Sequence, residues 1–394
     1  MGKFFKKQKN KTKAPAKKGG ASIRAAKPSE LGRIDVPFLL LVLALLGIGL
    51  IMVASSSYVS AYYSKGDSYY FIKRQLLFAI AGIVVMFVVA FIDYHRLRKF
   101  AFPILIIAII MLVLVLIPGI GVKVNGARRW LNFGVQFQPS EIGKFAIIVS
   151  FASYISANYK HMKKFTVGVM PLLVMLGTVV FLVAIETHLS GAILILAIGA
   201  IMMFVGGVAM KWFAAAIGIG VAGLTGLILF TPYMQSRINM WLNPYSDPQG
   251  AGYQIIQSLY AIGSGGPLGL GLGQSKQKHL YIPEPYNDYI FSITAEELGF
   301  VGALLIILLF VMLIWRGYKI AFHSRDKFGA MLVIGIVSRI AVQTILNIAV
   351  VTNAMPSTGI GLPFFSYGGT SLVVLMFEIG VVLSVSRYAY MDKV

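Results

Sequence analysis

The stretch Ile34-Asp-Val-Pro-Phe-Leu-Leu-Leu-Val-Leu-Ala-Leu-Leu-Gly-Ile-Gly-Leu-Ile-Met-Val-Ala-Ser55 is an apolar run with a single charged side chain, Asp35, near its start. A helix rises about 1.5 Å per residue, so a run of this length crosses a hydrocarbon core about 30 Å thick. Similar runs recur to the end of the chain, which is 58% hydrophobic and 12% charged. Soluble domains carry about 25% charged residues. The sequence therefore predicts an all-α integral membrane protein.

Charged or turn-rich segments separate the apolar runs and predict about ten transmembrane helices. Lys and Arg gather in one set of connections, and this bias marks the cytoplasmic side, so both the N and the C terminus are predicted to be cytoplasmic. On the other face, the longest connection predicts a large extracellular loop, about residues 232–288, between helices 7 and 8. The predicted spans are about 34–55, 75–92, 101–117, 139–158, 166–185, 189–208, 213–231, 289–314, 329–351 and 371–387.

Residues 1–33 form a separate basic segment with eleven Lys or Arg and one Glu, in a chain of net charge +21. The segment lacks the interleaved aromatic residues that would support contacts to nucleic acid bases, so no nucleic acid partner is predicted. We interpret residues 1–33 as a disordered cytoplasmic tail attracted to anionic lipids, at about 1 kcal/mol per basic residue near the surface. Residues 34–390 are predicted to form one polytopic membrane domain. The chain has no cysteine, which excludes disulfides and thiolate sites.

Acidic residues are scarce, yet four of the fourteen lie between Pro283 and Phe300. A charge at the point where a helix enters hydrocarbon is costly unless it is solvated or paired, so such residues indicate function. We expect Asp288 at the outer mouth of a span to be the functional one. Glu284 is interpreted as a loop charge, and Glu296 and Glu297, about two turns into the span, as packing or partner contacts.

Basic residues also occur on the predicted outer face, where they are expected to be few. They are either ordinary loop charges or a cluster that binds a phosphate-bearing ligand, for which arginine is well suited. Spacing alone leaves both alternatives open. The residues in question are Arg128, Arg129, Arg237, Lys276, Lys278 and His279.

Two further sets of charges lie within predicted helices. Glu141 and Lys144 are three residues apart on one helical face, so they predict either a surface ion pair or, as we prefer, a buried functional pair. Arg339 lies inside the ninth predicted span, and Glu378 of the tenth is its predicted partner. We interpret these two residues as packing and architecture. Asn353–Gly369 reads as a surface or re-entrant loop, which at membrane depth must line a cavity or be buried in protein.

Several segments together resemble the signature blocks of the SEDS family (shape, elongation, division and sporulation). The resemblance covers about residues 34–390, and its blocks occur in order. Within the family, the segments 351–356 and 378–387 are more similar to FtsW and SpoVE than to RodA. The blocks are Arg128-Arg-Trp130, Gln138-Pro-Ser-Glu-Ile-Gly-Lys144, Tyr253-Gln-Ile-Ile-Gln-Ser258, Gly269–Gln274, Pro283–Gly299 and Leu362-Pro-Phe-Phe-Ser-Tyr-Gly-Gly-Thr-Ser371.

The resemblance implies an inverting peptidoglycan glycosyltransferase that polymerises lipid II on the outer face of the bacterial cytoplasmic membrane. It further implies work at the division septum with a class B penicillin-binding protein and other divisome membrane proteins. Asp288 would be the catalytic base. No cofactor is certain; a divalent cation, Mg or Mn, could share in holding charge, although the sequence shows no convincing ligand set. The residues expected to bind the pyrophosphate of lipid II are Arg128, Arg129, Glu141, Lys144, Lys276 and Lys278.

The chain departs from the family pattern at two points. Tyr286 and Asn287 precede Asp288 where the family commonly has His and Thr, so a histidine role there is unsupported. His188-Leu-Ser-Gly191 stands where many members have Pro-Asp-Leu-Gly or Pro-Asp-Phe-Gly. The acidic group of that motif is absent, although Glu186 lies two positions earlier.

Three other functions remain open at this point: a lipid II flippase or transporter, a RodA-like elongation polymerase, and a non-enzymatic divisome scaffold. Transporters often contain inverted repeats with polar sites at the membrane midplane. Such repeats are not evident here, and the strongest carboxylate is predicted at the outer rim. An assay of the purified protein with lipid II separates the enzyme, which makes glycan strands, from a flippase or a scaffold.

Overall fold

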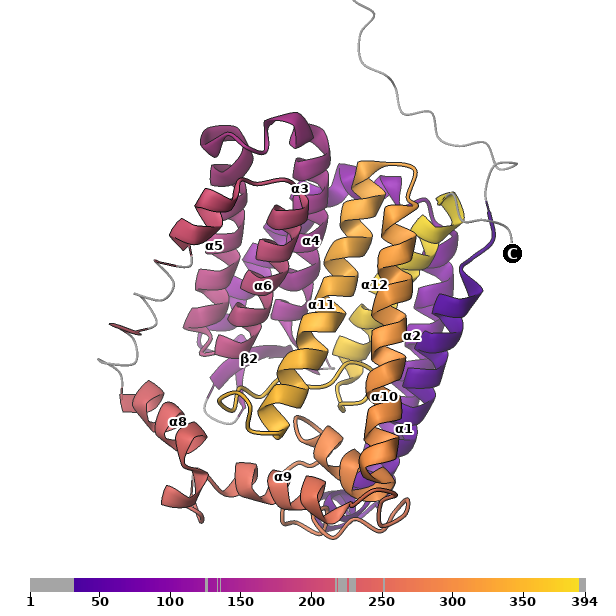
Figure 1. Ribbon diagram of the computed structural model, residues 1–394, viewed down its shortest axis with the longest axis vertical. Coiled ribbons are helices and arrows are strands. Elements are labelled where there is room, and N and C mark those ends of the chain that lie inside the picture. The colour runs from indigo at the N-terminus through magenta and orange to yellow at the C-terminus, as the bar shows by residue number, and fades with distance from the viewer. Residues whose placement is uncertain are drawn as a thin grey trace, which may run out of the picture. The chain divides into compact units, whose positions relative to one another are not determined.

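The computed structural model describes residues 32–389, except 125, 126, 133, 135, 217, 219–224, 227–231 and 251. Most of the predicted basic tail, residues 1–33, therefore lies outside the described residues and stays a prediction. The same holds for most of the predicted span 213–231. Figure 1 shows the helices that make up the rest of the chain.

Every predicted span other than 213–231 coincides with a helix, which confirms the helical prediction for the described part of the chain. Local signals fix several helix ends: Asp35 caps α1 by accepting a hydrogen bond from the Phe38 amide at 2.9 Å, and Gly66 ends α1 with φ 72°. The helices are α1 Val36–Lys65, α2 Tyr70–Phe91, α3 His95–Leu116, α4 Pro139–Asn158, α5 Met170–Ile185, α6 Leu189–Val205, α8 Pro232–Leu242, α9 Tyr253–Ser264, α10 Ile290–Phe322, α11 Lys327–Val351 and α12 Gly369–Tyr388.

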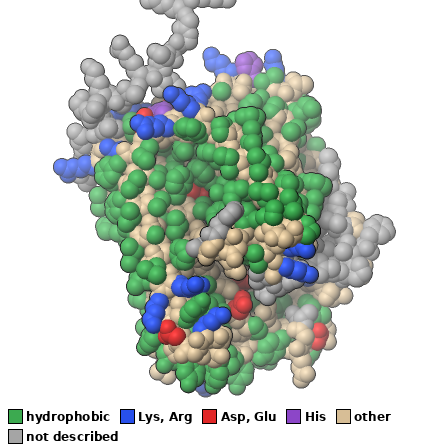
Figure 2. Space-filling view, turned by 180° about the vertical axis from the view of Figure 1, so that it is seen from behind, with side chains coloured by type: hydrophobic (Ala, Val, Ile, Leu, Met, Phe, Trp, Pro, Cys, Tyr) green, Lys and Arg blue, Asp and Glu red, His purple; other side chains and the backbone are tan. Residues whose placement is uncertain are grey.

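Seven helical segments among the described residues are long and apolar enough to cross a membrane. Large apolar side chains point outward from them: Leu77 and Phe102 are each 69% exposed. Figure 2 shows these side chains as a broad hydrophobic belt, with basic side chains gathered towards its two ends. This pattern fits a multi-pass membrane protein. The seven segments are α1, α2, α3, Phe165–Ile185, α10, α11 and α12, and α6 is a shorter apolar helix.

The interior of the bundle is formed mainly by α4, α11 and α12. Of the most apolar windows, those of α11 and α12 are 72% and 67% buried, against 28% for α2 and α3. Close helix contacts explain part of this burial. A Cβ added to Gly380 of α12 would lie 2.6 Å from the backbone oxygen of Met86 in α2, so only glycine permits this approach.

α10 contains a break that corrects the predicted span 289–314. Gly299 has φ 69° and ψ −173°, which no helix accommodates, so 290–298 forms a short helix of its own before the long segment 300–322. Glu296 and Glu297 lie about two turns into α10, shortly before this break. The long segment rises about 1.5 Å per residue and is still long enough to cross a bilayer.

A small antiparallel sheet interrupts the otherwise helical chain between α3 and α4, which the all-α prediction missed. Its strands are β1 Gly121–Val124, β2 Ala127–Asn132 and β3 Gln136–Phe137, in the order β1-β2-β3. Leu131 of β2 pairs with both Gly121 and Phe137. The sheet fixes the direction in which Arg128 and Arg129 leave the backbone.

The described ends of the chain lie together. The Gly32 amide donates to the Arg387 carbonyl at 2.8 Å, and the Asp35 amide donates to the Ser386 hydroxyl at 3.2 Å. Arg316 near the end of α10 pairs with Asp35 at 2.8 Å. This end of the bundle is opposite the end that carries β2, α8 and α9 (Figure 1). The segment 232–288, predicted as one large loop, contains the helices α8 and α9.

Candidate active site

Asp288 lies two residues before α10, partly buried at the end of the bundle that carries the sheet. Its carboxylate Oδ2 is only 3.1 Å from the position that a Cβ on Gly359 would occupy. Its backbone carbonyl accepts a hydrogen bond from Asn347 Nδ2 at 2.8 Å. Burial raises the pKa of Asp288 to about 6; the negative charge of Glu284 adds to this rise, and Arg129 opposes it. This carboxylate can therefore exchange a proton near neutral pH.

The segment Thr352–Gly368, which we call the site loop, packs against Asp288 and is held by two amide side chains of α11. Asn347 Nδ2 also donates to the Ile360 carbonyl at 2.7 Å, and Gln343 Nε2 donates to the Gly361 carbonyl at 2.8 Å. Ile360 and Leu362–Phe365 of the site loop are buried in protein, whereas Thr352–Gly359 are partly or fully exposed. The sequence contained a signal for Asn347 and Gln343, because they recur at intervals of four on one face of the predicted helix.

The residues just before Asp288 are held by the other end of the site loop. Ser366 Oγ donates to the Asn287 carbonyl at 2.7 Å, and the Tyr367 amide donates to the Tyr286 carbonyl at 2.9 Å. The ring of Tyr286 stacks on Phe71 of α2, with centroids 4.3 Å apart. Tyr286 occupies the position where the family commonly has histidine, and here it is an aromatic packing residue.

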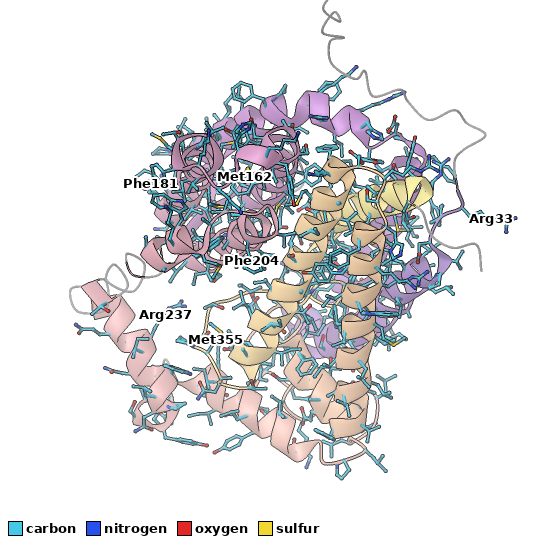
Figure 3. All side chains as sticks on the ribbon, turned by 45° about the horizontal axis from the view of Figure 1, so that its top comes forward. Arg33, Met162, Phe181, Phe204, Arg237 and Met355 are labelled. Carbon is cyan, nitrogen blue, oxygen red and sulfur yellow. The ribbon has the colours of Figure 1, made fainter. Side chains whose placement is uncertain are left out.

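α8 also contacts the site loop. Arg237 donates from Nη1 to the Ser357 carbonyl, and Trp241 Nε1 donates to the Asn353 carbonyl at 3.1 Å. Figure 3 shows Arg237 next to the part of the loop that carries Met355. Arg237, one of the basic residues predicted on the outer face, thus contacts the site loop.

Arg129 is the predicted basic residue that the fold brings towards Asp288. It leaves β2 and donates from Nη2 to the Thr187 carbonyl at 2.6 Å. Its positive charge acts on Asp288 and lowers the pKa of that carboxyl against the effect of burial. Arg128 is its neighbour in β2 and lies opposite Lys123 in the sheet. The electrostatic contact between Arg129 and Asp288 therefore links β2 to the segment that precedes α10.

The short connection between α5 and α6, together with the first turn of α6, also contacts the residues of the site. Ser190 Oγ donates to the Thr358 carbonyl of the site loop. The His188 ring faces α4, with Nδ1 3.3 Å from Gln138 Nε2 and 3.4 Å from Ser140 Oγ. Burial lowers the pKa of His188 to about 3, and the charges of Arg129 and Lys144 add to this effect. His188 is therefore neutral and serves as a buried contact.

Glu141 and Lys144 are buried inside the bundle, as the preferred alternative for this pair predicted. Lys144 Nζ is 2.6 Å from Glu141 Oε1, and Arg339 Nη2 is 2.5 Å from Glu141 Oε2. Arg339 Nη1 also pairs with Glu378, the partner expected from the sequence. These four charges connect α4, α11 and α12. A direct role of Glu141 and Lys144 in binding substrate stays a prediction.

Lys276 and Lys278 lie in the segment that leads towards the start of α10. Lys278 is 4% exposed, and its Nζ lies 2.9 Å from Glu297 Oε1. Glu296 accepts hydrogen bonds from Ser275 Oγ at 2.5 Å and from the Lys276 amide at 2.9 Å. Glu296 and Glu297 thus make packing contacts, as expected, whereas the Lys276 side chain is exposed. Substrate binding by either lysine stays a prediction.

Metal ligands were left open by the sequence. Within the described ranges, no group of three or more His, Asp or Glu side chains is placed to hold a metal ion. The described residues therefore offer no preformed set of three such ligands for a divalent cation.

Fold and site together define a class: a multi-pass helical membrane protein with a proton-exchanging carboxylate and a guanidinium at one end of its bundle. A family model described as cell cycle protein, covering FtsW, RodA and SpoVE, matches residues 37–391. The chain therefore belongs to the FtsW, RodA and SpoVE family, which is the SEDS family predicted from its sequence.

Individual relatives agree with this assignment. The chain is 45% identical over 356 residues to Stage V sporulation protein E of Bacillus subtilis, covering 90% of this chain and 97% of that protein. It is 41% identical over 361 residues to a probable peptidoglycan glycosyltransferase FtsW of Trichlorobacter lovleyi, covering 91% and 95%. These two relatives confirm the similarity to FtsW and SpoVE.

Solved structures show the same fold. One chain comes from a structure titled for the structural coordination of polymerization and crosslinking by a peptidoglycan synthase complex. It superposes with a TM-score of 0.75 at 28% identity, covering 91% of this chain and 99% of that one. The rod shape determining protein RodA of Thermus thermophilus superposes with a TM-score of 0.66 at 25% identity, covering 91% and 98%.

Proposed function

We propose that this protein is an inverting peptidoglycan glycosyltransferase that polymerises lipid II into glycan strands on the outer face of the cytoplasmic membrane. The observation that carries the proposal is the carboxylate of Asp288, which is partly buried, is held by the site loop and has its pKa raised to about 6. The relatives named as probable peptidoglycan glycosyltransferases support the reaction class.

In the proposed reaction, the 4-hydroxyl of the acceptor N-acetylglucosamine attacks C1 of the donor N-acetylmuramic acid with inversion. Asp288 accepts the proton of that hydroxyl, and the bond from C1 to undecaprenyl pyrophosphate breaks. General-base catalysis of this kind contributes about 10²–10⁴-fold when the pKa of the base lies near the working pH. A pKa of about 6 leaves Asp288 ionised at pH 7 and still basic enough to accept a proton.

The leaving pyrophosphate needs positive charge, and Arg129 is the side chain best placed to supply it. Its charge already acts at the position of Asp288, and arginine binds phosphate through two parallel hydrogen bonds. Preorganised charge at a leaving group is often the largest single contribution to catalysis. Arg128 and the exposed Lys276 would extend the same basic surface along the lipid-linked substrate.

The proposed topology places ten helices across the membrane with both termini in the cytoplasm. The adjacency of Gly32 and Arg387 supports a common side for the two ends. The site would then face outward with β2 and α8, where lipid II is polymerised. We further propose a septal role and a class B penicillin-binding protein as partner. The peptidoglycan synthase complex among the structural neighbours supports such a partner.

The decisive experiment measures glycan strands made from lipid II by the purified protein, alone and with its penicillin-binding partner. Asp288→Asn keeps the size of the side chain and removes its basicity, so we expect a rate at least about 10²-fold lower with unchanged expression. Asp67→Asn is the matched control, because Asp67 is an exposed carboxylate in the α1–α2 connection, paired with Lys73 at 2.8 Å. Full activity of Asp288→Asn would refute the assignment, and lipid II transport without glycan strands would indicate a flippase.

A further inference from the structure

Glu186 is a buried carboxyl group that the proposed reaction does not use. It follows the last residue of α5 and is 2% exposed. Neither Oε1 nor Oε2 has a hydrogen-bond partner among the described residues. Leaving a buried polar group unpaired costs about 1–3 kcal/mol, so such a group in a folded protein needs an explanation.

The next residue, Thr187, has a strained backbone conformation, and its carbonyl group faces Arg129. Its φ is 57°, a left-handed conformation that threonine rarely adopts. In this conformation its carbonyl accepts the hydrogen bond from Arg129 Nη2 at 2.6 Å. Backbone strain of this kind costs about 1–3 kcal/mol and tends to occur at functional sites. Thr187 thus ties the α5–α6 connection to the Arg129 guanidinium, and Glu186 is the residue directly before Thr187.

The first turn of α6, directly after this connection, contacts the part of the site loop that lies beside Asp288. Ser190 Oγ donates to the Thr358 carbonyl, and the following residue, Gly359, is the close neighbour of Asp288 Oδ2. The charge of Arg129 acts on Glu186 as well as on Asp288. One guanidinium therefore lies within electrostatic reach of two carboxyl groups from different segments.

We propose that Glu186 is a positioning residue. Its ionisation decides how strongly the positive charge of Arg129 acts on Asp288 and on an anionic substrate. This inference rests on the proposed glycosyltransferase function. While Glu186 is neutral, the charge of Arg129 is directed at Asp288 and at an anionic substrate. Once Glu186 ionises, it competes with both for the same guanidinium.

The expected pH dependence follows from the two carboxyl groups. Burial raises the pKa of Glu186 to about 8, and Arg129 opposes this rise. The other charged groups around the connection are Glu141 and Lys144 of α4, which face His188, and Glu284 beside Asp288. Because Asp288 is ionised above about pH 6 and Glu186 is neutral below about pH 8, both groups are in their active forms between these values.

The test is the pH profile of glycan-strand synthesis from lipid II by the full-length purified protein. We expect the wild-type rate to rise near pH 6 and to fall above pH 8, by about tenfold at one pH unit beyond the pKa of Glu186. In Glu186→Gln the side chain cannot ionise, so the rise near pH 6 should remain and the alkaline fall should disappear. If Glu186 had only a structural role, Glu186→Gln would change the rate at every pH and would not remove the alkaline fall alone.

A second variant serves as the test if the Glu186→Gln protein folds poorly. Glu186→Met is neutral, similar in length and apolar, and replacing an unpaired polar group by an apolar one is nearly neutral or stabilising. It should melt at or above the wild-type temperature and also lack the alkaline fall. Asp67→Asn, which changes an exposed carboxylate, should keep the wild-type profile.

The outcomes separate this inference from the proposed function. Loss of the alkaline fall in both Glu186 variants supports it. An alkaline fall that persists in folded Glu186→Gln and Glu186→Met overturns it, as does a wild-type profile without such a fall. If Asp288→Asn remains fully active, the proposed function fails instead. A combined Arg129→Lys and Glu186→Gln variant should show less than the sum of the two single effects if Glu186 acts through Arg129.

Discussion

Arg339 is the centre of the buried ion network, and replacing it by methionine is expected to destabilise the helix bundle. The guanidinium is 2.5 Å from Glu141 and also pairs with Glu378. The side chains of Arg339 and Glu378 are 3% and 0% exposed, so water cannot replace the lost partner. Methionine has a similar length and carries no charge. The variant Arg339→Met therefore removes the interaction with little change in packing.

The size of the destabilisation expected for Arg339→Met depends on the ion-pair partners that Glu141 and Glu378 keep in this variant. Glu141 keeps Lys144, whose Nζ is 2.6 Å away, whereas Arg339 is the only ion-pair partner of Glu378 among the described residues. Removing one member of a buried ion pair costs about 3–5 kcal/mol, because the other charge stays buried and uncompensated. We expect this loss for Arg339→Met. Replacing Glu378 by leucine as well should recover most of it, since apolar replacement of a whole buried pair is often neutral.

The assay is thermal unfolding of the purified protein in detergent, followed by the fluorescence of its four tryptophans. Arg339→Met should lower the midpoint by roughly 10 °C, and the Arg339→Met/Glu378→Leu variant should lie close to the wild type. Lys73→Met, which breaks an exposed pair with Asp67, is the control and should not change the midpoint measurably. If the double variant is no more stable than the single one, an uncompensated charge on Glu378 is not the cause.

Two further predictions concern the support of Asp288. Asn347→Leu removes the hydrogen bonds to the carbonyls of Asp288 and Ile360, so we expect a loss of about 2–3 kcal/mol in unfolding experiments and at least about a tenfold lower polymerisation rate. An unchanged rate would show that these bonds do not position the carboxylate. Gly359→Ala places a Cβ 3.1 Å from Asp288 Oδ2 at a backbone φ of 67°, and the polymerisation rate should fall. Gly66→Ala has a similar φ of 72° with open space around it, so it carries the same strain and should keep its rate.

The helical part of the fold could be predicted because long apolar runs carry the necessary information by themselves. Each predicted span other than 213–231 corresponds to a helix among the described residues. Local runs do not reveal a break inside an apolar helix, and the prediction was wrong at Gly299 for this reason. The sheet was missed because its strands have only four, six and two residues, too short for a clear alternating pattern.

The candidate site could be predicted as a set of residues but not as an arrangement. Asp288 stood out because carboxylates are rare in this chain, and Arg129 because basic residues are unexpected on the outer face. Their proximity depends on β2, the α5–α6 connection and the site loop, which meet only in the folded protein. Gln343 and Asn347 hold the site loop, a role that the sequence did not predict. Their spacing of four residues predicts that they share a helical face, but it cannot predict which backbone carbonyls they contact.

The distribution of charge explains why Asp288, and none of the ion-paired carboxylates, is suited to acid–base chemistry. Glu141 is paired with Lys144 and Arg339, Glu378 with Arg339, and Glu297 with Lys278. Each of these carboxylates is engaged in a direct ion pair with a basic side chain inside the protein. For Asp288, burial and the negative charge of Glu284 raise the pKa of the carboxyl group, and Arg129 offsets only part of this rise. A base of this kind, next to a guanidinium that can bind phosphate, is what transfer of a sugar from a pyrophosphate requires.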